Sequence, residues 1–155
     1  MKTDVEQLLS EVFYCVLEKY AFMFGELSAK DQLFISDTEF TEVVIDFSGP
    51  RNGKISISVP TRVCPQIAVN VLGHSPEEDI ENWGVDALKE LLNVTCGSVL
   101  LAFYGEDLIL DISPPISRPL SLQDWNALLN DPNTLAYLVD DSPMLLQFTL
   151  TASGE

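Results

Sequence analysis

The segment VDALKELLNVTCGSVLLAF, residues 85–103, constrains the fold most, because its polar and apolar residues separate at helical spacing. Asp86, Glu90 and Asn93 fall within roughly 60° of one another on a helix, and Gly97 extends the same stripe. We predict that this stripe faces solvent. The opposite face is predicted to be buried through its apolar residues, which are Val85, Leu88, Leu91, Leu92, Val99, Ala102 and Phe103.

The residues of the stripe permit two interpretations. A carboxylate and a carboxamide one turn apart can grip a cation and orient a water, and a glycine lets the backbone of a partner come close. The same spacing also fits a solvated helix face that happens to contain one glycine. The spacing alone leaves both interpretations open.

Size and composition predict one folded domain over residues 1–155. Hydrophobic residues make up 46% of the chain and charged residues 21%, which is typical of a globular protein with its own core. No continuous apolar run reaches the roughly 18 residues that a membrane span needs. The chain opens MKTDVEQ, with acids where a signal peptide is basic and then apolar. We therefore expect a cytoplasmic protein.

The charge balance excludes several classes of partner. Twenty-four acidic residues against eight Lys and Arg give a formal net charge of −16. Nucleic acid is disfavoured because neutralising phosphates requires clustered Lys and Arg, and an anionic membrane surface would repel the chain. The charge fits solubility, or a protein partner that offers a basic patch.

Cysteine and histidine usage argues against a metal site. Cys15, Cys64 and Cys96 stand far apart in apolar surroundings, which predicts reduced, buried thiols. His74 is the single histidine, and neither a CxxC nor an HxxxH pair occurs. A catalytic triad through His74 would lack a GxSxG elbow, and the isolated glycines form no phosphate loop. A small-molecule enzyme with its own pocket is therefore disfavoured.

The first half of the chain predicts a helix and a hairpin. Thr3 and Glu6 form a capping box that opens a long amphipathic helix, which we expect to end at 25–27. EFTEVVIDFSG and KISISVP predict two strands joined across GPRNG. Since Ser56 and Ser58 alternate with apolar residues, one face of this sheet is predicted to be wet.

Two helix signals follow the hairpin. PQIAVNVLG predicts a helix with Pro65 in its first turn and Gly73 at its end. SPEE predicts another start at Ser75, with a short helix over 76–82 that Trp83-Gly84 separates from the long helix to Phe103.

The remaining segments predict mostly strands. Residues 108–112 read as a strand ending at Pro114-Pro115, and SLQDWNALLN reads as a helix capped by Ser121. TLAYLVDD and PMLLQFTLTA predict a hairpin that turns at Asp141-Ser142. This order gives an α+β domain in which two long helices and shorter ones pack on a mainly antiparallel sheet.

The spacing Asp86-x-x-x-Glu90-x-x-Asn93 resembles the signature of the CheC/CheX/FliY phosphatases, in which a proline follows downstream. Pro115 stands one residue off the family's spacing, and Gly97 matches a glycine that the family places four residues after the asparagine. The stretch NGKISISVPTRVCPQIAVNVLG resembles the family's strand and following helix. Residues 1–30 contain no asparagine, so the first helix carries no second motif; one motif on the second long helix resembles CheX rather than CheC.

The resemblance implies a phosphatase that removes the phosphoryl group from the aspartate of a CheY-like receiver domain. Carried over by position, Asn93 orients the attacking water and Glu90 contacts a lysine of the receiver, while Asp86, Gly97 and Pro115 belong to the partner-binding surface. The resemblance implies no cofactor of the chain's own, because the receiver supplies Mg²⁺ together with the phosphoaspartate.

Two further expectations concern partners. A non-catalytic protein of the same fold, which docks a receiver or a flagellar-switch component, keeps the same stripe and is the alternative to a phosphatase. CheX proteins pair by extending their sheets, so we expect a homodimer through an edge strand such as Leu145–Thr151. A monomer whose last hairpin is interior is the alternative.

Overall fold

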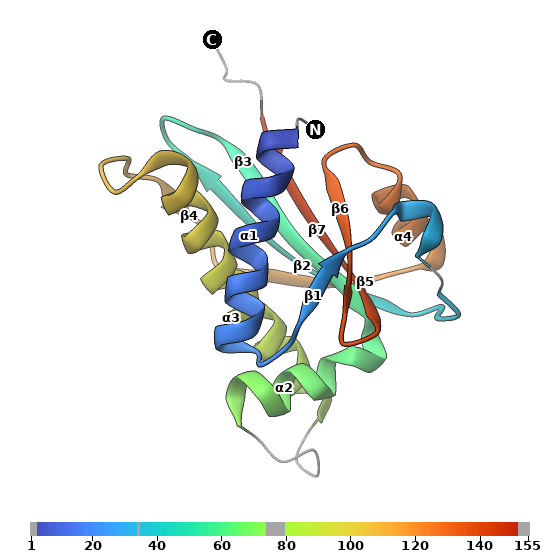
Figure 1. The fold of residues 1–155 in the computed structure, drawn as a ribbon. Coiled ribbons are helices and arrows are strands. Elements are labelled where there is room, and N and C mark those ends of the chain that lie inside the picture. The colour runs from blue at the N-terminus through green and yellow to red at the C-terminus, as the bar shows by residue number, and fades with distance from the viewer. Residues whose placement is uncertain (1–2, 34, 74–79, 152–155) are drawn as a thin grey trace.

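The computed structural model describes residues 3–33, 35–73 and 80–151, and within these ranges seven strands form one antiparallel sheet with four α-helices packed on it (Figure 1). The predicted α+β class is confirmed. The elements are α1 (Thr3–Tyr20), β1 (Gly25–Leu27), β2 (Phe40–Ser48), β3 (Gly53–Pro60), α2 (Cys64–Leu72), α3 (Ile80–Tyr104), β4 (Asp111–Ile112), β5 (Ile116–Leu120), α4 (Leu122–Leu129), β6 (Thr134–Val139) and β7 (Ser142–Leu150).

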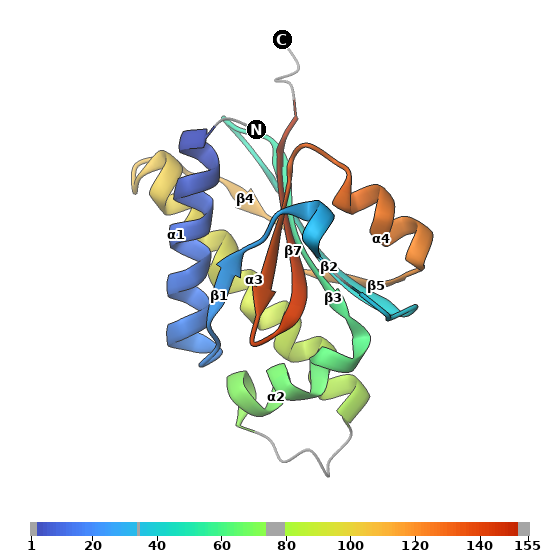
Figure 2. The same ribbon diagram turned by 45° about the vertical axis from the view of Figure 1, so that its right-hand side comes forward.

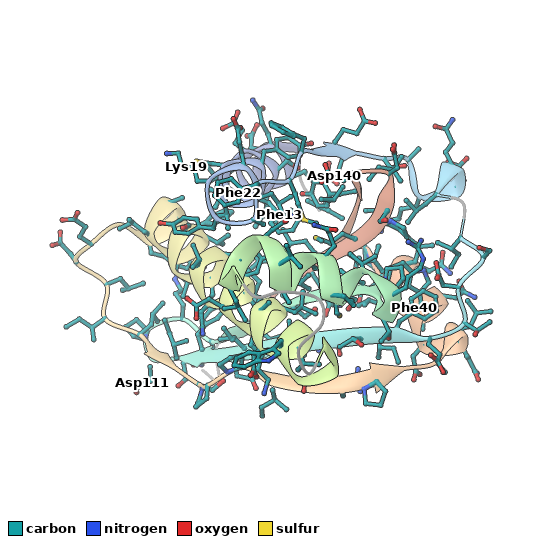
Figure 3. The ribbon with its side chains drawn as sticks, turned by 90° about the horizontal axis from the view of Figure 1, so that it is seen from below. Phe13, Lys19, Phe22, Phe40, Asp111 and Asp140 are labelled. Atoms are coloured by element: carbon teal, nitrogen blue, oxygen red, sulfur yellow. The ribbon has the colours of Figure 1, made fainter. Side chains whose placement is uncertain are left out.

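The sheet runs in the order β1-β6-β7-β3-β2, and β4 and β5 both pair with β2 at the far edge. One face, which we call the inner face, is covered by α1 and α3; the other, the outer face, carries α4 (Figure 2). The main core lies under α1 and α3, where Phe13 of α1 is fully buried, and a smaller core lies under α4, where Trp125 stacks on Phe40 with ring centroids 4.3 Å apart. The view from below labels Phe13 of the main core beside α1, and Phe40 of the smaller core well apart from it (Figure 3).

The first helix begins at Thr3 as predicted, but it ends at Tyr20 and not at 25–27. The backbone N–H groups of Ala21 and Met23 both donate to the carbonyl of Leu17 at 3.0 Å, and Phe22 turns the chain with φ 52°. Residues 25–27 then form β1, which pairs with β6. The helix extent was wrong because this pairing partner lies more than a hundred residues away in the sequence.

The hairpin of β2 and β3 is confirmed, but the predicted wet face is wrong. Ser56 and Ser58, on the central strand β3, are 1% and 0% exposed, so side chains of other residues cover this face as well. Ser58 donates to the carboxylate of Glu42 at 3.4 Å, and Glu42, itself buried, accepts from Arg118 at 2.6 Å. The alternation therefore marks a polar layer inside the structure and not a solvated one.

The helix α2 matches its prediction, with Pro65 in the first turn and Gly73 ending it at φ 70°. The predicted break at Trp83-Gly84 is wrong, because α3 runs through both residues without interruption. A Cβ on Gly84 would lie 2.8 Å from the Cβ of Cys64, so this glycine lets α2 and α3 pack closely. The proposed start at Ser75, and most of the proposed helix 76–82, lie outside the described residues.

The strand predicted over 108–112 is reduced to Asp111–Ile112, and β5 was not predicted at all. β5 contains Pro119, which usually argues against a strand, but a strand at the edge of a sheet tolerates a proline. Its pairing with the first half of β2 leaves Pro114-Pro115 in the short connection between β4 and β5.

The helix α4 and the final hairpin are confirmed, but the predicted position of the turn and the predicted dimer edge are wrong. Ser121 caps α4 by accepting from the backbone N–H of Asp124 at 3.1 Å. The final hairpin turns at Asp140-Asp141, one residue before the predicted position, with φ values of 47° and 68° that suit a tight strand-to-strand turn. The strand β7 lies between β6 and β3, so the segment from Leu145 is interior and cannot be the open edge of a dimer.

The prediction of buried thiols holds for two of the three cysteines. Cys64 and Cys96 are buried, and burial raises the pKa of each thiol to about 11. Cys15 of α1 is exposed. The two buried thiols are thus poor nucleophiles at neutral pH, since thiolate is the reactive form.

Candidate functional site

The helix α3 presents the predicted stripe to solvent. Asp86, Glu90, Asn93 and Gly97 are all exposed. Within the described residues, the side chains of Asp86, Glu90 and Asn93 make no hydrogen bond or ion pair. Their polar atoms are therefore available to a partner.

The opposite face of α3 fixes the direction of the stripe. Leu88, Leu91, Leu92 and Val99 are 0% exposed in the main core, as predicted, whereas Ala102, predicted to be buried, is exposed. Ala102 lies in the last turn, where the neighbouring Phe103 still packs on the core and stacks on Phe148 with ring centroids 5.3 Å apart. Because three turns of α3 are anchored on one side, the stripe is held on a rigid element and not on a loop.

The two glycines of α3 have different surroundings. The Cβ that an alanine would add at Gly84 meets Cys64, but at Gly97 nothing lies within 4 Å of that position. A glycine in the middle of a helix costs roughly 0.5–1 kcal/mol relative to alanine. Packing within the described chain explains Gly84 and gives no reason for Gly97.

Sequence reasoning missed an apolar groove that begins at Gly97. The groove has a volume of about 440 Å³ and runs along the last turns of α3 to β4. Three large apolar side chains in it are unusually exposed: Leu101 by 52%, Ile109 by 83% and Ile112 by 48%. Leu101 gave a usable signal, because it lies one turn beyond Gly97 on the same side of the helix. Ile109 and Ile112 gave none, because loop and strand positions reach the groove only through the fold.

The last predicted residue, Pro115, is half-buried in the connection that leads away from this groove, between Ile112 and Ile116. The structure thus places Asp86, Glu90, Asn93 and Gly97 on one surface of α3, and Pro115 on a neighbouring element. No group of His, Cys, Asp or Glu in the described residues is arranged to hold a metal ion. His74 lies outside the described residues.

The sequence model of one protein family, described as "Chemotaxis phosphatase CheX", matches residues 42–119. The matched region is half of the chain and contains the whole stripe, the groove and Pro115. The chain belongs to the CheX family. No curated protein sequence matches it.

Solved structures share the fold of this CheX-family chain at low sequence identity. A chemotaxis protein CheX from Desulfovibrio desulfuricans superposes with a TM-score of 0.70 at 15% identity, covering 96% of this chain and 99% of that one. A putative chemotaxis protein from Desulfovibrio vulgaris Hildenborough gives 0.69 at 16% identity, covering 96% and 97%. The CheX–CheY–BeF₃–Mg²⁺ complex from Borrelia burgdorferi gives 0.64 at 14% identity, covering 97% and 100%.

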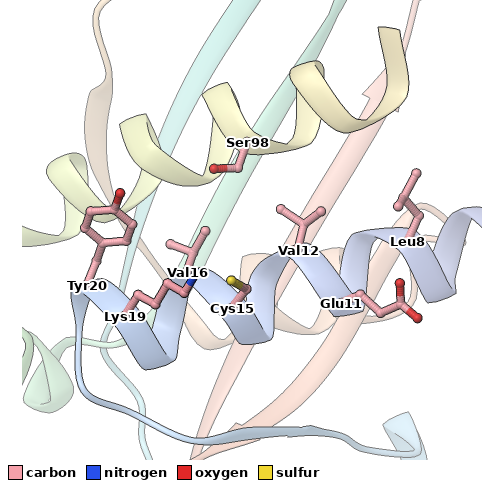
Figure 4. Close-up of a pocket in the computed structure, with 8 residues that line it drawn as sticks. All are labelled: Leu8, Glu11, Val12, Cys15, Val16, Lys19, Tyr20 and Ser98. Atoms are coloured by element: carbon pink, nitrogen blue, oxygen red, sulfur yellow. The ribbon is translucent and has the colours of Figure 1, made fainter. Parts of the chain in front are cut away.

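A second hollow lies between α1 and α3 (Figure 4), with a volume of about 370 Å³. Ser98 of α3 faces Val12 and Val16 of α1 across it, and Cys15 and Lys19 lie along its α1 side. None of the stripe residues lines it. In this CheX-family chain α1 carries no Glu–Asn pair, so the hollow has none of the chemistry that the stripe of α3 presents.

By length and mean hydropathy alone, Trp83–Tyr104 would be able to span a membrane. In the structure this segment is the core helix of the CheX fold, with its leucine face packed under the sheet and its acidic stripe outside. Its apolar character is explained by that packing.

The two glycines of α3 predict opposite effects of the same substitution. Gly84→Ala should lower the free energy of unfolding by about 1–3 kcal/mol, because the added methyl collides with Cys64. Gly97→Ala should raise it by roughly 0.5–1 kcal/mol, because the methyl meets nothing and the helix gains propensity. Urea denaturation of both variants measures this. A destabilised Gly97→Ala variant would show that the fold itself needs this glycine.

Proposed function

We propose that this CheX-family protein dephosphorylates the aspartyl phosphate of a CheY-like receiver domain, with Asn93 orienting the attacking water and Glu90 docking a lysine of the receiver. The observation that carries the proposal is the exposed, unpaired Glu90–Asn93 pair on a rigid helix of a chain that belongs to a family of chemotaxis phosphatases.

An amide at position 93 suits the chemistry of phosphoryl transfer. This reaction requires positioning and charge stabilisation more than covalent help, and an amide orients the attacking water in GTPases. The side chain of Asn93 can accept from a water with its oxygen and donate with its nitrogen. A carboxylate at this position would be repelled by the phosphoryl oxygens, so a neutral group is the suitable one.

Glu90 lies one turn before Asn93 on the same side of the helix, where its charge is kept away from the reacting phosphate. A carboxylate there can pair with a lysine of the receiver and orient the docked complex. Asp86, one turn further, extends the same acidic surface. We propose that Mg²⁺ arrives with the receiver, whose own carboxylates hold it beside the phosphoaspartate.

In the alternative function the protein binds a receiver but does not hydrolyse its aspartyl phosphate. A receiver-binding or flagellar-switch-type protein would use the same stripe to dock without accelerating hydrolysis. The intact Asn93 favours the phosphatase, because docking alone does not require an exposed amide beside the carboxylate. A cytoplasmic location fits either function, since receivers of this kind act inside the cell.

Asn93→Ala should reduce the acceleration of receiver dephosphorylation by about a hundredfold or more, the usual effect of removing a group that acts in the transition state. Binding of the phosphorylated receiver and the fold should change little, because Asn93 is exposed and contributes nothing to the core. The decay of phosphoaspartate, followed with radiolabelled phosphate, measures the rate. Asn126→Ala, at an exposed position on α4, is the control. A variant as fast as the wild type would remove Asn93 from the mechanism, and a wild type that binds without accelerating decay would support the non-catalytic alternative.

Glu90→Lys should weaken capture of the receiver about tenfold to a hundredfold, because loss of a charge-assisted contact costs about 1.5–3 kcal/mol. Titration with a receiver held in its active form by Mg²⁺ and beryllofluoride measures the dissociation constant. Glu18→Lys makes the same charge change on the exposed side of α1 and controls for net charge. Equal affinities for the Glu90→Lys and Glu18→Lys variants would exclude a specific lysine partner for Glu90.

We also propose a homodimer, now through a different edge of the sheet. Since β7 is interior, the candidates among the described strands are β1 at one edge and β4 with β5 at the other. Such an edge presents backbone N–H and C=O groups that a second copy can pair with. Sedimentation at micromolar concentration should give about twice the chain mass of 17.2 kDa. A single species at the monomer mass would remove the dimer and leave the proposed phosphatase mechanism intact.

A further inference from the structure

We infer that the receiver-binding surface continues along α3 beyond the catalytic pair into the apolar groove of Leu101, Ile109 and Ile112. In this arrangement the backbone of the receiver crosses Gly97, and one of its apolar side chains fills the groove. The inference rests on the proposed function and names a second part of its docking surface.

The space around Gly97 is open. The chain accepts the cost of a mid-helix glycine at a position where an alanine would touch nothing. At Gly84 in the same helix the fold itself requires glycine, because a Cβ there would lie 2.8 Å from the Cβ of Cys64. Nothing in the described part of the chain accounts for a glycine at 97, and a closely approaching backbone of a partner is an object that a missing Cβ admits.

The groove continues the stripe along α3. Gly97 belongs to both, and Leu101 follows it one turn later on the same side of the helix. Eight residues separate Asn93 from Leu101, which is about 12 Å along the helix axis. A typical protein interface buries about 800 Å² on each partner, so one receiver bound at Asn93 also covers the groove.

The large apolar side chains of the groove are exposed to solvent. Ile109 is 83% exposed, and it lies in one hollow with the half-exposed Leu101 and Ile112. Single exposed apolar side chains are common, but a contiguous group of them marks a surface that another molecule covers. Nine of the ten residues that line the groove are uncharged, with Glu106 as the exception, and a depletion of charged residues is typical of the core of a protein interface.

The acidic residues around the groove favour a receiver as the partner over a second copy of the chain or an anionic membrane. Glu106, Asp107 and Asp111 are exposed at its rim, and the stripe adds Asp86 and Glu90. A second copy of a chain with net charge −16 would bring more acid to this rim, and an anionic membrane would do the same. The receiver is the partner that already brings a lysine to Glu90, so it meets the acidic surface with a complementary charge.

The experiment separates capture from catalysis. Rates of phosphoaspartate loss are measured against the concentration of a phosphorylated CheY-type receiver, with Mg²⁺ present, for the wild type and for a Leu101→Ser/Ile109→Ser variant. The variant should raise KM at least tenfold and leave kcat within about twofold of the wild type. Leu122→Ser, a similar change on α4 at the outer face of the sheet, should change neither (Figure 2).

A size series at Gly97 tests the backbone approach independently. Gly97→Ala and Gly97→Leu should raise KM in that order, although the alanine variant is the more stable protein. Circular dichroism confirms that each variant is folded.

The outcomes distinguish the inference from the proposed function. An unchanged KM in the groove variant overturns the inference while the phosphatase stands, since the wild type is still active. A groove variant that converts a dimer into a monomer in sedimentation would assign the groove to a second copy and overturn the inference as well. A wild type that leaves the receiver's phosphate untouched rejects the proposed function, and the inference with it.

Discussion

The burial of one face of α3 is the interaction on which the rest of the structure depends. Leu88, Leu91, Leu92 and Val99 are withdrawn from water completely, and the apolar residues of α1, α2 and the inner face of the sheet close around them. Gly84 brings α2 close enough to complete this packing. Each fully buried leucine or valine contributes on the order of 1.5–3 kcal/mol relative to exposure, so the orientation of α3 is fixed by the largest favourable term available to the chain.

This arrangement separates stability from function on a single helix. Because the apolar face anchors α3 in the core, Glu90 and Asn93 on the outward face can be kept without a side-chain partner in the described part of the chain. The glycine at 97 follows the same logic. Gly97 lowers the stability of the helix slightly, and burial of the apolar face of α3 outweighs this loss. A site on such a helix is held in position by the core and does not require its own hydrogen-bond support.

Local pattern predicted those elements whose signals are local. The stripe of α3, the proline and glycine ends of α2, the cap of α4 and the two hairpins all follow from short-range spacing or turn chemistry. The strands β1 and β5 did not, because their pairing with β6 and β2 is decided by distant segments. Ser56 and Ser58 show the same limit, since alternation tells which residues share a face and not whether another layer covers it. The groove was missed for this reason too: Leu101, Ile109 and Ile112 come from a helix, a loop and a strand that only the fold brings together.

The net charge of −16 imposes a further condition on how such a protein can capture its partner. An aspartyl phosphate is itself negative, so the overall field of this chain does not draw the reacting centre toward α3. Charges at long range are screened within about 10 Å at ordinary salt, whereas contacts inside a closed interface are not. On the proposed function, capture then depends on short-range interactions. These are a neutral amide at the position proposed for the phosphate, a carboxylate proposed to pair with a lysine, and an apolar groove whose burial does not depend on the sign of the charge. The stripe and the groove together offer all three, which is why we assign the apolar end of α3 to the same proposed docking surface as its polar end.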